Sequence, residues 1–201
     1  MTSKTRRRPK PSVRIVSGRW KGRALQVPRA ARPTSGRARE ALFSILHDSV
    51  VGAAVLDLYA GSGALGLEAV SRGARLAVLV EEDATALEKN AARLDPEGER
   101  LRVLRGDAAH AVAKLARGAE RFELIFADPP YSGVMPPDLL AGAAALLSPG
   151  GLLILQRDGP TAPPSEPPGV ALVERRRYGR NVFYFFSQAG SSLDLCAPES
   201  F

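Results

Sequence analysis

The chain has 201 residues, 45% of them apolar, so it is long enough for one medium-sized domain with an ordinary core. The single cysteine, Cys196, excludes a disulfide framework within one chain, and neither His47 nor His110 stands in a cluster with metal-ligand spacing, so we expect no metal site. No apolar run reaches membrane-spanning length and no signal-peptide pattern opens the chain, so we expect a cytoplasmic protein without membrane contact.

Charge is distributed unevenly along the chain. Residues 1–40 carry 13 lysines and arginines and one acid, for a net charge of +12, whereas residues 41–201 sum to −5. A basic arm on a mildly acidic body indicates a polyanionic partner, most simply a nucleic acid. The alternative, a solvated basic tail, is what we expect for residues 1–12, which are predicted to be disordered.

Residues 13–16 and 24–27 are short strand candidates, and the two glycines between them allow a β-hairpin-like excursion. The tip of this excursion carries Arg19, Trp20, Lys21 and Arg23. A basic, aromatic, glycine-bounded loop suits phosphates together with stacking on a base or a ribose. The alternative is that Trp20 packs against the body of the protein.

A helix is predicted over residues 37–46, because apolar side chains recur there at helical spacing. Thr34 or Ser35 can provide its N-terminal cap. Arg37 and Glu40 lie near the start of this helix and face either a pocket or solvent.

Residues 53–59 form the first predicted core strand, residues 60–66 a glycine-rich turn, and the next helix opens at residue 67. The glycines let a ligand approach the backbone, and the helix N-terminus presents free N–H groups. A lone Gly-x-Gly is weak evidence by itself.

Acids stand at the ends of the next two predicted strands. Glu81 closes the strand over residues 76–80, about twenty residues after the glycine turn, where an acid can bind ribose hydroxyls. Asp107 follows the strand over residues 101–104; it either accepts a hydrogen bond from an adenine amine or caps a helix over residues 108–117, and both roles are compatible. A helix over residues 84–94 lies between these strands.

The fourth strand, residues 124–127, stops at Asp128-Pro129-Pro130-Tyr131, because consecutive prolines donate no backbone hydrogen bonds. The carboxylate of Asp128 and a neighbouring carbonyl can accept both hydrogens of a planar –NH₂ group, and the Tyr131 ring can stack on the base that carries it. Such acceptors would catalyse by positioning and electrostatics. The alternative is a β-turn that Asp128 caps and against which Tyr131 packs.

Beyond this corner the sequence predicts a helix over residues 137–147, a strand over 152–156, and an antiparallel hairpin of residues 170–178 and 182–186. Residues 189–201 are predicted to be disordered. Alternating strands and helices indicate an α/β fold with a mainly parallel sheet. The convergence of the four corners on one sheet edge predicts a nucleoside-containing cofactor beside a pocket for a planar amine.

Residues 55–69, together with residues 128–131, resemble the S-adenosylmethionine-dependent amino-methyltransferases with an Asp-Pro-Pro-Tyr motif. Residues 14–23 and 32–40 narrow the resemblance to the bacterial 16S rRNA (guanine-966-N2)-methyltransferase family, over roughly residues 13–187. The resemblance implies a Rossmann-like methyltransferase fold with a seven-stranded, mostly parallel sheet, an antiparallel C-terminal hairpin and an N-terminal β-hairpin extension. It divides the chain into an RNA-binding segment at residues 13–50 and a methyltransferase domain at residues 51–188.

The resemblance also assigns roles to individual residues. It implies S-adenosylmethionine as cofactor, bound by Asp57, Tyr59, Ala60, Gly61, Ser62, Gly63, Glu81, Glu82, Asp107, Ala108 and Asp128. It implies a catalytic corner of Asp128, Pro129, Pro130 and Tyr131, and RNA contacts from Arg19, Trp20, Lys21, Arg23, Arg32, Arg37 and Arg39. The expected partner is 16S rRNA or the assembling small ribosomal subunit, and the expected oligomeric state is a monomer. The chain departs from the family at Gly36 and near Gln156, where an acid is common.

Three other functions remain open on sequence grounds. Adenine-N6 methylation of DNA uses the same corner, although 201 residues leave little room for a target-recognition domain. Protein glutamine methylation would fit better with an asparagine in place of Asp128. A non-catalytic RNA-binding assembly factor could keep the fold without the activity.

Overall fold

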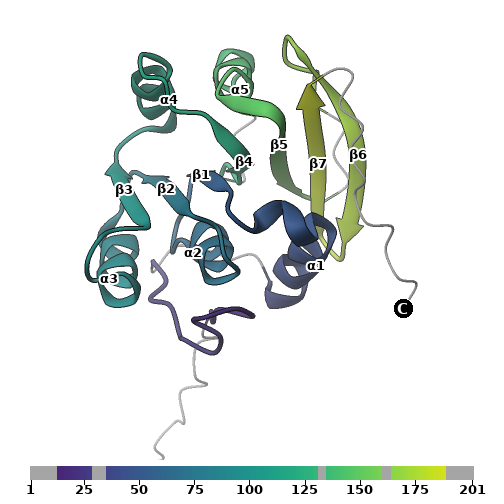
Figure 1. The fold of residues 1–201 in the computed structure, drawn as a ribbon. Coiled ribbons are helices and arrows are strands. Elements are labelled where there is room, and N and C mark those ends of the chain that lie inside the picture. The colour runs from purple at the N-terminus through teal and green to yellow at the C-terminus, as the bar shows by residue number, and fades with distance from the viewer. Residues whose placement is uncertain (1–12, 29–34, 131–134, 160–163, 189–201) are drawn as a thin grey trace, which may run out of the picture.

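The computed structural model describes residues 13–28, 35–130, 135–159 and 164–188 (Figure 1). The expected tails at residues 1–12 and 189–201 lie outside these ranges, as do Arg32, Thr34, Tyr131 and Cys196. Nothing in the described residues therefore bears on them.

A seven-stranded sheet in the order β3-β2-β1-β4-β5-β7-β6 forms the centre of the molecule. The strands are β1 Ala54–Leu58, β2 Leu76–Glu81, β3 Leu101–Arg105, β4 Phe122–Ala127, β5 Leu147–Asp158, β6 Val170–Tyr178 and β7 Asn181–Gln188. Strands β1 to β5 run parallel to their neighbours, whereas β7 pairs antiparallel with both β5 and β6. The predicted α/β fold, with its mostly parallel sheet and C-terminal hairpin, is confirmed.

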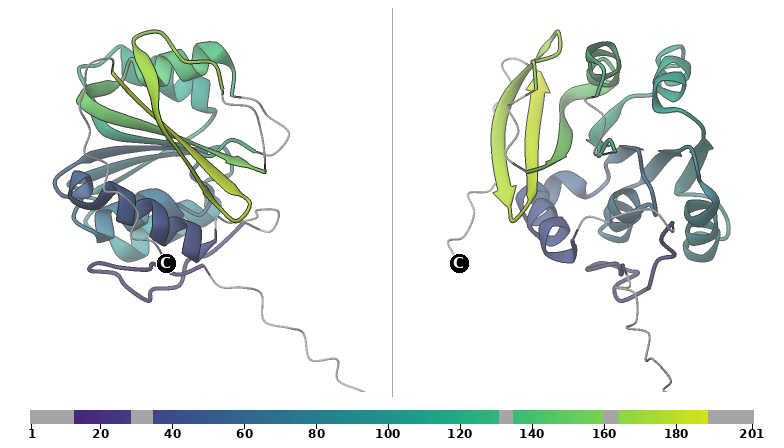
Figure 2. Two further views of the ribbon diagram at one scale, coloured as in Figure 1. Left: turned by 90° about the vertical axis from the view of Figure 1, so that its right-hand side faces the viewer. Right: turned by 180° about the vertical axis from the view of Figure 1, so that it is seen from behind.

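Helices cover both faces of this sheet (Figure 2). They are α1 Gly36–Leu46, α2 Ala64–Ser71, α3 Thr85–Leu94, α4 Ala108–Ala116 and α5 Pro137–Ala144, with a short 3₁₀ helix, η1 His47–Val50, after α1. Helices α1 to α3 lie on one face, and α4 and α5 lie on the other (Figure 1). Burial on both faces explains why the parallel strands read as continuous apolar runs in the sequence.

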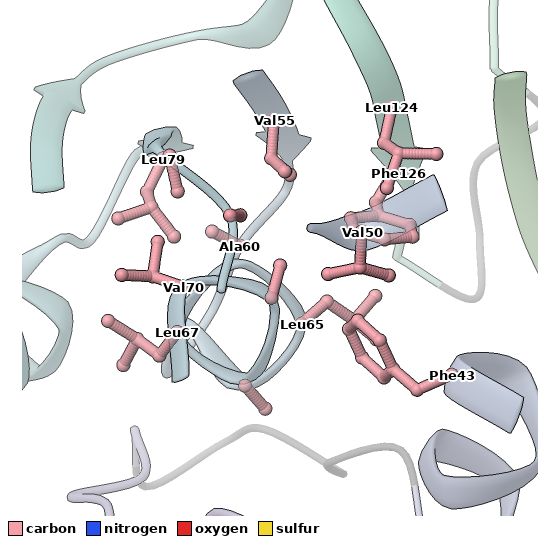
Figure 3. Packing of buried hydrophobic residues seen from close by; sticks show 14 of the residues in the cluster. Phe43, Val50, Val55, Ala60, Leu65, Leu67, Val70, Leu79, Leu124 and Phe126 are labelled. Carbon is pink, nitrogen blue, oxygen red and sulfur yellow. The ribbon is translucent and has the colours of Figure 1, made fainter. Parts of the chain in front are cut away.

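Aromatic and branched side chains fill the layer between the sheet and helices α1 to α3 (Figure 3). Phe43 of α1 meets Phe126 of β4 edge to face, with ring centroids 5.9 Å apart. Ser35 caps α1, as one of the two predicted candidates, by accepting a hydrogen bond from the Ala38 N–H. The N-terminal segment Val13, Ile15, Trp20 and Leu25 belongs to this same core, so residues 13–28 pack as part of the main body.

The predicted N-terminal hairpin-like excursion is present: Arg14 and Ala24 form an antiparallel bridge, flanked by hydrogen bonds from the Leu25 N–H to the Val13 carbonyl at 2.7 Å and from the Ile15 N–H to the Arg23 carbonyl at 3.0 Å. The two strand candidates are short, and beyond their pairing Val16 and Ser17 donate their N–H groups to the Glu68 carboxylate of α2. Strand β5 is longer than predicted. It begins at Leu147, so the Pro-Gly-Gly sequence at residues 149–151 lies inside it, beside an irregularity in its pairing with β4.

Candidate active site

The candidate site lies at the carboxyl edge of the sheet, where β1 and β4 end side by side. Leu58 of β1 pairs in register with Ala127 of β4, and the Asp128 N–H lies 3.4 Å from the Leu58 carbonyl oxygen. Asp128 therefore stands beside Tyr59, the residue that opens the glycine turn. This adjacency fixes the proline-bounded carboxylate next to the place where a cofactor can approach the backbone.

The turn after β1 has a tightly constrained backbone. Tyr59 adopts φ +62°, and Gly61 and Gly63 also have positive φ values. Gly63 occupies the N-cap position of α2 and has no side chain to cap it, so the buried Asp57 of β1 accepts the Gly66 N–H at 2.8 Å in its place. The predicted cofactor residue Asp57 is thus a support beneath the turn, with only 1% of its surface exposed.

Negative charge is crowded at this edge. Burial raises the pKa of Asp57 to about 7, against the opposing effect of the Gly66 N–H, and the charges of Asp128 and Glu81 raise it further. The same Asp128 and Glu81 are the carboxylates predicted to hold substrate and ribose. A cationic ligand here would relieve their mutual repulsion.

Glu81 is held directly over the glycine turn. One of its carboxylate oxygens accepts the Gly61 N–H at 2.7 Å, and the other accepts the Asp83 N–H at 3.3 Å. A carboxylate has about four lone-pair positions, so these bonds orient Glu81 and leave acceptor capacity for ribose hydroxyls.

Asp107 caps α4, accepting the His110 N–H at 2.9 Å, which confirms the capping role; its contact with adenine stays a prediction. Tyr59 lies near this acid: burial raises the Tyr59 pKa, and the charges of Asp107 and Glu82 raise it further. The remaining predicted cofactor residues also follow the ends of these strands. The Ala60 N–H donates to the Val80 carbonyl, and Ser62 is buried. Glu82 is exposed directly after β2, and Ala108 is the first residue of α4.

The predicted catalytic corner is braced by the next two strands. Gln156 of β5 donates from Nε2 to Asp128 Oδ2 at 3.1 Å and to Asn181 Oδ1 of β7 at 3.3 Å. Asp128, Gln156 and Asn181 therefore form a polar row across three adjacent strands. Pro129 is half-buried and Pro130 is exposed, and Tyr131 is outside the described residues.

Sequence reasoning had singled out Gln156 only as a departure from a family pattern and had missed Asn181. The period of two along β5 was the available signal, since it places Gln156 on the same face as Ile154 at the end of a strand next to β4.

Two of the predicted RNA contacts are corrected. Trp20 is 8% exposed and belongs to the core, so the packing alternative holds and its ring is not available for stacking on a base. Arg39 is 1% exposed, because its guanidinium turns inward to the Arg14 carbonyl and to the buried Glu68, 3.7 Å from Nε. Burial lowers the pKa of Arg39, which the charge of Glu68 partly offsets.

Arg19, Lys21 and Arg23 are exposed, but they lie at the far end of α2 from the glycine turn. The Arg19 N–H donates to the carbonyl of Ser71, the last residue of α2, at 2.8 Å. Because α2 begins at the glycine turn and runs back along the sheet, this loop is at the opposite edge from Asp128. Arg37 is exposed in the first turn of α1.

Glu68 is a structural residue that the sequence analysis missed. Its buried carboxylate accepts the N–H groups of Val16 and Ser17 at 2.7 and 2.9 Å and pairs with Arg72 at 2.8 Å. The signal was an acid inside the apolar run of residues 64–70, where a charge is buried only if it is paired.

Two further features bear on ligands. Among residues 13–28, 35–130, 135–159 and 164–188, no three His, Cys, Asp or Glu side chains gather in a group that could hold a metal ion. Over the same residues, no helix has the length and apolar character needed to span a membrane.

The chain is similar in sequence to proteins that are named as ribosomal RNA methyltransferases. It is 43% identical over 124 residues to "Ribosomal RNA small subunit methyltransferase D" of Escherichia coli (strain K12), a match that covers 59% of this chain and 60% of that protein. It is 29% identical over 184 residues to "Putative rRNA methyltransferase YlbH" of Bacillus subtilis (strain 168), covering 89% of this chain and 100% of that one. The chain thus spans 60% of the length of the first of these relatives.

The architecture is shared with a solved structure, "Putative methyltransferase yhhF from Escherichia coli", with a TM-score of 0.75 and 32% identity, over 89% of this chain and 98% of that one. The family model described as "Conserved hypothetical protein 95" matches residues 13–187, which include the glycine turn, the acids after β2 and β3, and the proline corner. On sequence, fold and site geometry together, the chain belongs to the Conserved hypothetical protein 95 family.

Proposed function

We propose that this protein is an S-adenosylmethionine-dependent rRNA methyltransferase that methylates the exocyclic N2 amine of a guanine in small-subunit rRNA. The observation that carries the proposal is the register of β1 and β4, which sets Asp128 beside the glycine turn. A methyl donor bound over that turn and an amine bound at Asp128 would be immediate neighbours.

The residues at the edge fit the cofactor. Glu81 is oriented for ribose, the N-terminus of α2 faces the turn, and Asp57 has a pKa raised to about 7 by burial and by neighbouring carboxylates. Bound S-adenosylmethionine supplies an electrophilic methyl group on a positively charged sulfur, and this site has negative charge in excess.

Asp128 acts on the amine. Its carboxylate, braced by Gln156, accepts one N–H of the guanine amine and aligns the nitrogen with the methyl carbon. Asp128 or solvent would take the proton that the amine loses when its nitrogen is methylated. A guanine inside a helix must first be extruded, at a cost of a few kcal/mol.

The rRNA substrate is supported by the names of the relatives and by the positive charge of residues 1–40. We extend the proposal to 16S rRNA, alone or in the assembling small subunit, and to action as a monomer. Adenine in duplex DNA offers the same chemical group, so the substrate has to be tested directly.

The test combines methyl transfer with cofactor binding. Asp128→Ala is expected to lower turnover on small-subunit RNA by about 100-fold or more, while calorimetric S-adenosylmethionine affinity stays within a few-fold of wild type. Asp138→Ala, at an exposed acid in the first turn of α5, is the matched control and should remain active. Nucleoside analysis of the product should show N2-methylguanine.

Each part of the proposal can fail separately. Normal turnover by the Asp128→Ala variant would show that the catalytic corner is wrongly assigned. Methylation of duplex DNA instead of RNA would move the substrate to adenine N6. Absence of cofactor binding by the wild-type protein would favour a non-catalytic RNA-binding factor.

A further inference from the structure

Charge divides the carboxyl edge of the sheet into two halves. The half formed by β1, β2 and β3 carries the acids Asp57, Glu81, Glu82, Asp83 and Asp107. Arg105 also ends β3, paired with Glu88 at 2.9 Å, but the acids outnumber it, so this half keeps a net negative charge. This half suits a cationic cofactor and repels the phosphates of a nucleic acid.

The other half, formed by β5, β7 and β6, is basic. Residues 174–181, which span the end of β6 and the turn into β7, hold four arginines and one acid, for a net charge of +3. The acids here are already paired, Glu174 with Arg176 and Asp158 with Arg180, both at 3.1 Å. Arg175, Arg177 and Arg180 are exposed.

The tip of the hairpin lies at the same edge as Asp128. Strand β5 ends at Asp158, which pairs with Asn181, so the turn at Gly179 and Arg180 projects from the carboxyl edge. Asn181 is joined to Asp128 through Gln156 by two hydrogen bonds. With strands ~4.8 Å apart, β6 lies about 14 Å from β4, within the span of a few nucleotides.

The hairpin lies at the outer side of the sheet. It forms the end of the strand order, beyond β5, and its β6 strand pairs only with β7 among the described strands (Figures 1 and 2). In contrast, the basic loop at Arg19, Lys21 and Arg23 is at the opposite edge, where the Arg19 N–H donates a hydrogen bond to the Ser71 carbonyl. Phosphates next to a base held at Asp128 would therefore meet the hairpin before they meet that loop.

We propose that the β6–β7 hairpin is an RNA-binding surface that holds the phosphates adjacent to the target base, through Arg175, Arg177 and Arg180. This inference rests on the proposed function and specifies the side from which the RNA enters. Guanidinium groups bind phosphate oxygens through paired N–H donors. The guanidinium of Arg177 is already oriented at the tip, since its Nε donates to the Gly179 carbonyl at 3.0 Å.

A different explanation for arginines on an edge strand is protection against strand pairing between molecules. That role would affect aggregation and leave RNA affinity unchanged. The two explanations are therefore separated by measuring RNA binding and its salt dependence on soluble, folded protein.

The experiment compares Arg177→Ala/Arg180→Ala with wild type in direct binding to in vitro transcribed small-subunit rRNA, without cofactor. We expect about tenfold weaker binding and a shallower salt slope, by about 0.7 per lost phosphate contact. Arg105→Ala is the matched control, because it also removes an exposed, ion-paired arginine at the carboxyl edge, but on the acidic half. Its RNA affinity and salt slope should equal those of wild type.

Calorimetric binding of S-adenosylmethionine shows that each variant retains a folded cofactor site. An RNA affinity and salt slope unchanged in the double variant would overturn the hairpin surface while leaving the proposed function intact. Equal losses of RNA affinity in the double variant and in Arg105→Ala would also overturn it, because the loss would then follow from the lower positive charge of the whole protein and not from the hairpin. Wild-type protein that binds cofactor but no RNA would overturn the proposed function together with the surface.

Discussion

Replacing Asp57 by asparagine should stabilise the protein at alkaline pH. Asp57 is buried beneath the glycine turn and accepts the Gly66 N–H, and its pKa rises from 3.8 to about 7. Because the pKa is higher in the folded state, the folded protein binds this proton more tightly than the unfolded chain does. Asp57 thus contributes its full stability below pH 3.8, and that contribution is lost as the pH rises through about 7.

The magnitude follows from the two pKa values. The rise corresponds to roughly 4 kcal/mol over the whole titration, of which about 3 kcal/mol falls between pH 8.5 and pH 5. The Asp57→Asn variant stays neutral throughout, and its side-chain oxygen can still accept the Gly66 N–H. The variant should therefore be more stable than wild type at pH 8.5, and acidification to pH 5 should remove most of the advantage.

Thermal unfolding at a series of pH values measures this directly. For a chain of this length, 1 kcal/mol shifts Tm by about 2–4 °C, so the Tm difference between the two proteins should shrink by about 6–12 °C from pH 8.5 to pH 5. Asp138→Asn serves as the control, because Asp138 is exposed in the first turn of α5 and its replacement should give no such trend. A Tm difference between wild type and Asp57→Asn that is the same at both pH values would refute the reasoning.

Two other substitutions test contacts that define the site and its support. Gly18→Ala should lower the free energy of unfolding by about 2 kcal/mol or more, measured by urea unfolding. An added Cβ would lie 1.8 Å from the Ser71 carbonyl oxygen, and Gly18 has φ +80°. A variant as stable as wild type would contradict this close packing. Gln156→Met preserves the length of the side chain but removes the hydrogen bond that Gln156 donates to Asp128. We therefore expect kcat to fall about tenfold or more while the affinity for S-adenosylmethionine is unchanged. An unaltered kcat would show that this hydrogen bond does not position Asp128.

The sheet and the cofactor edge were predictable because local pattern and tertiary structure agree there. Apolar runs marked the buried strands, and strand ends marked by glycine, acid or proline fell on one edge, as parallel connections require. The positions of Gly61, Glu81 and Asp128 followed from this rule alone. Helix ends such as that of α5 differed by a few residues, since strand pairing of Leu147 with Phe122 decides where β5 begins.

The N-terminal segment was less predictable because its conformation depends on residues far along the chain. Trp20 and Arg39 read as RNA contacts from their basic surroundings, but the first packs into the core and the second is drawn inward by the buried Glu68. The sequence of residues 13–40 does not indicate that Glu68 packs against them. The basic β6–β7 hairpin was overlooked for a related reason: its closeness to Asp128 arises from the strand order, which the sequence does not display.

The hydrogen bonds of the N-terminal segment also constrain the order of events as the chain is synthesised. Val16, Ser17, Trp20 and Gln26 donate to acceptors that stand 51 to 64 residues later, on α2 and α3. Residues 13–28 can therefore reach their final conformation only after residue 90 has emerged from the ribosome. Until then the arginines of this segment remain solvated, and its docking is among the later steps in folding of the part of the molecule that contains α2 and α3.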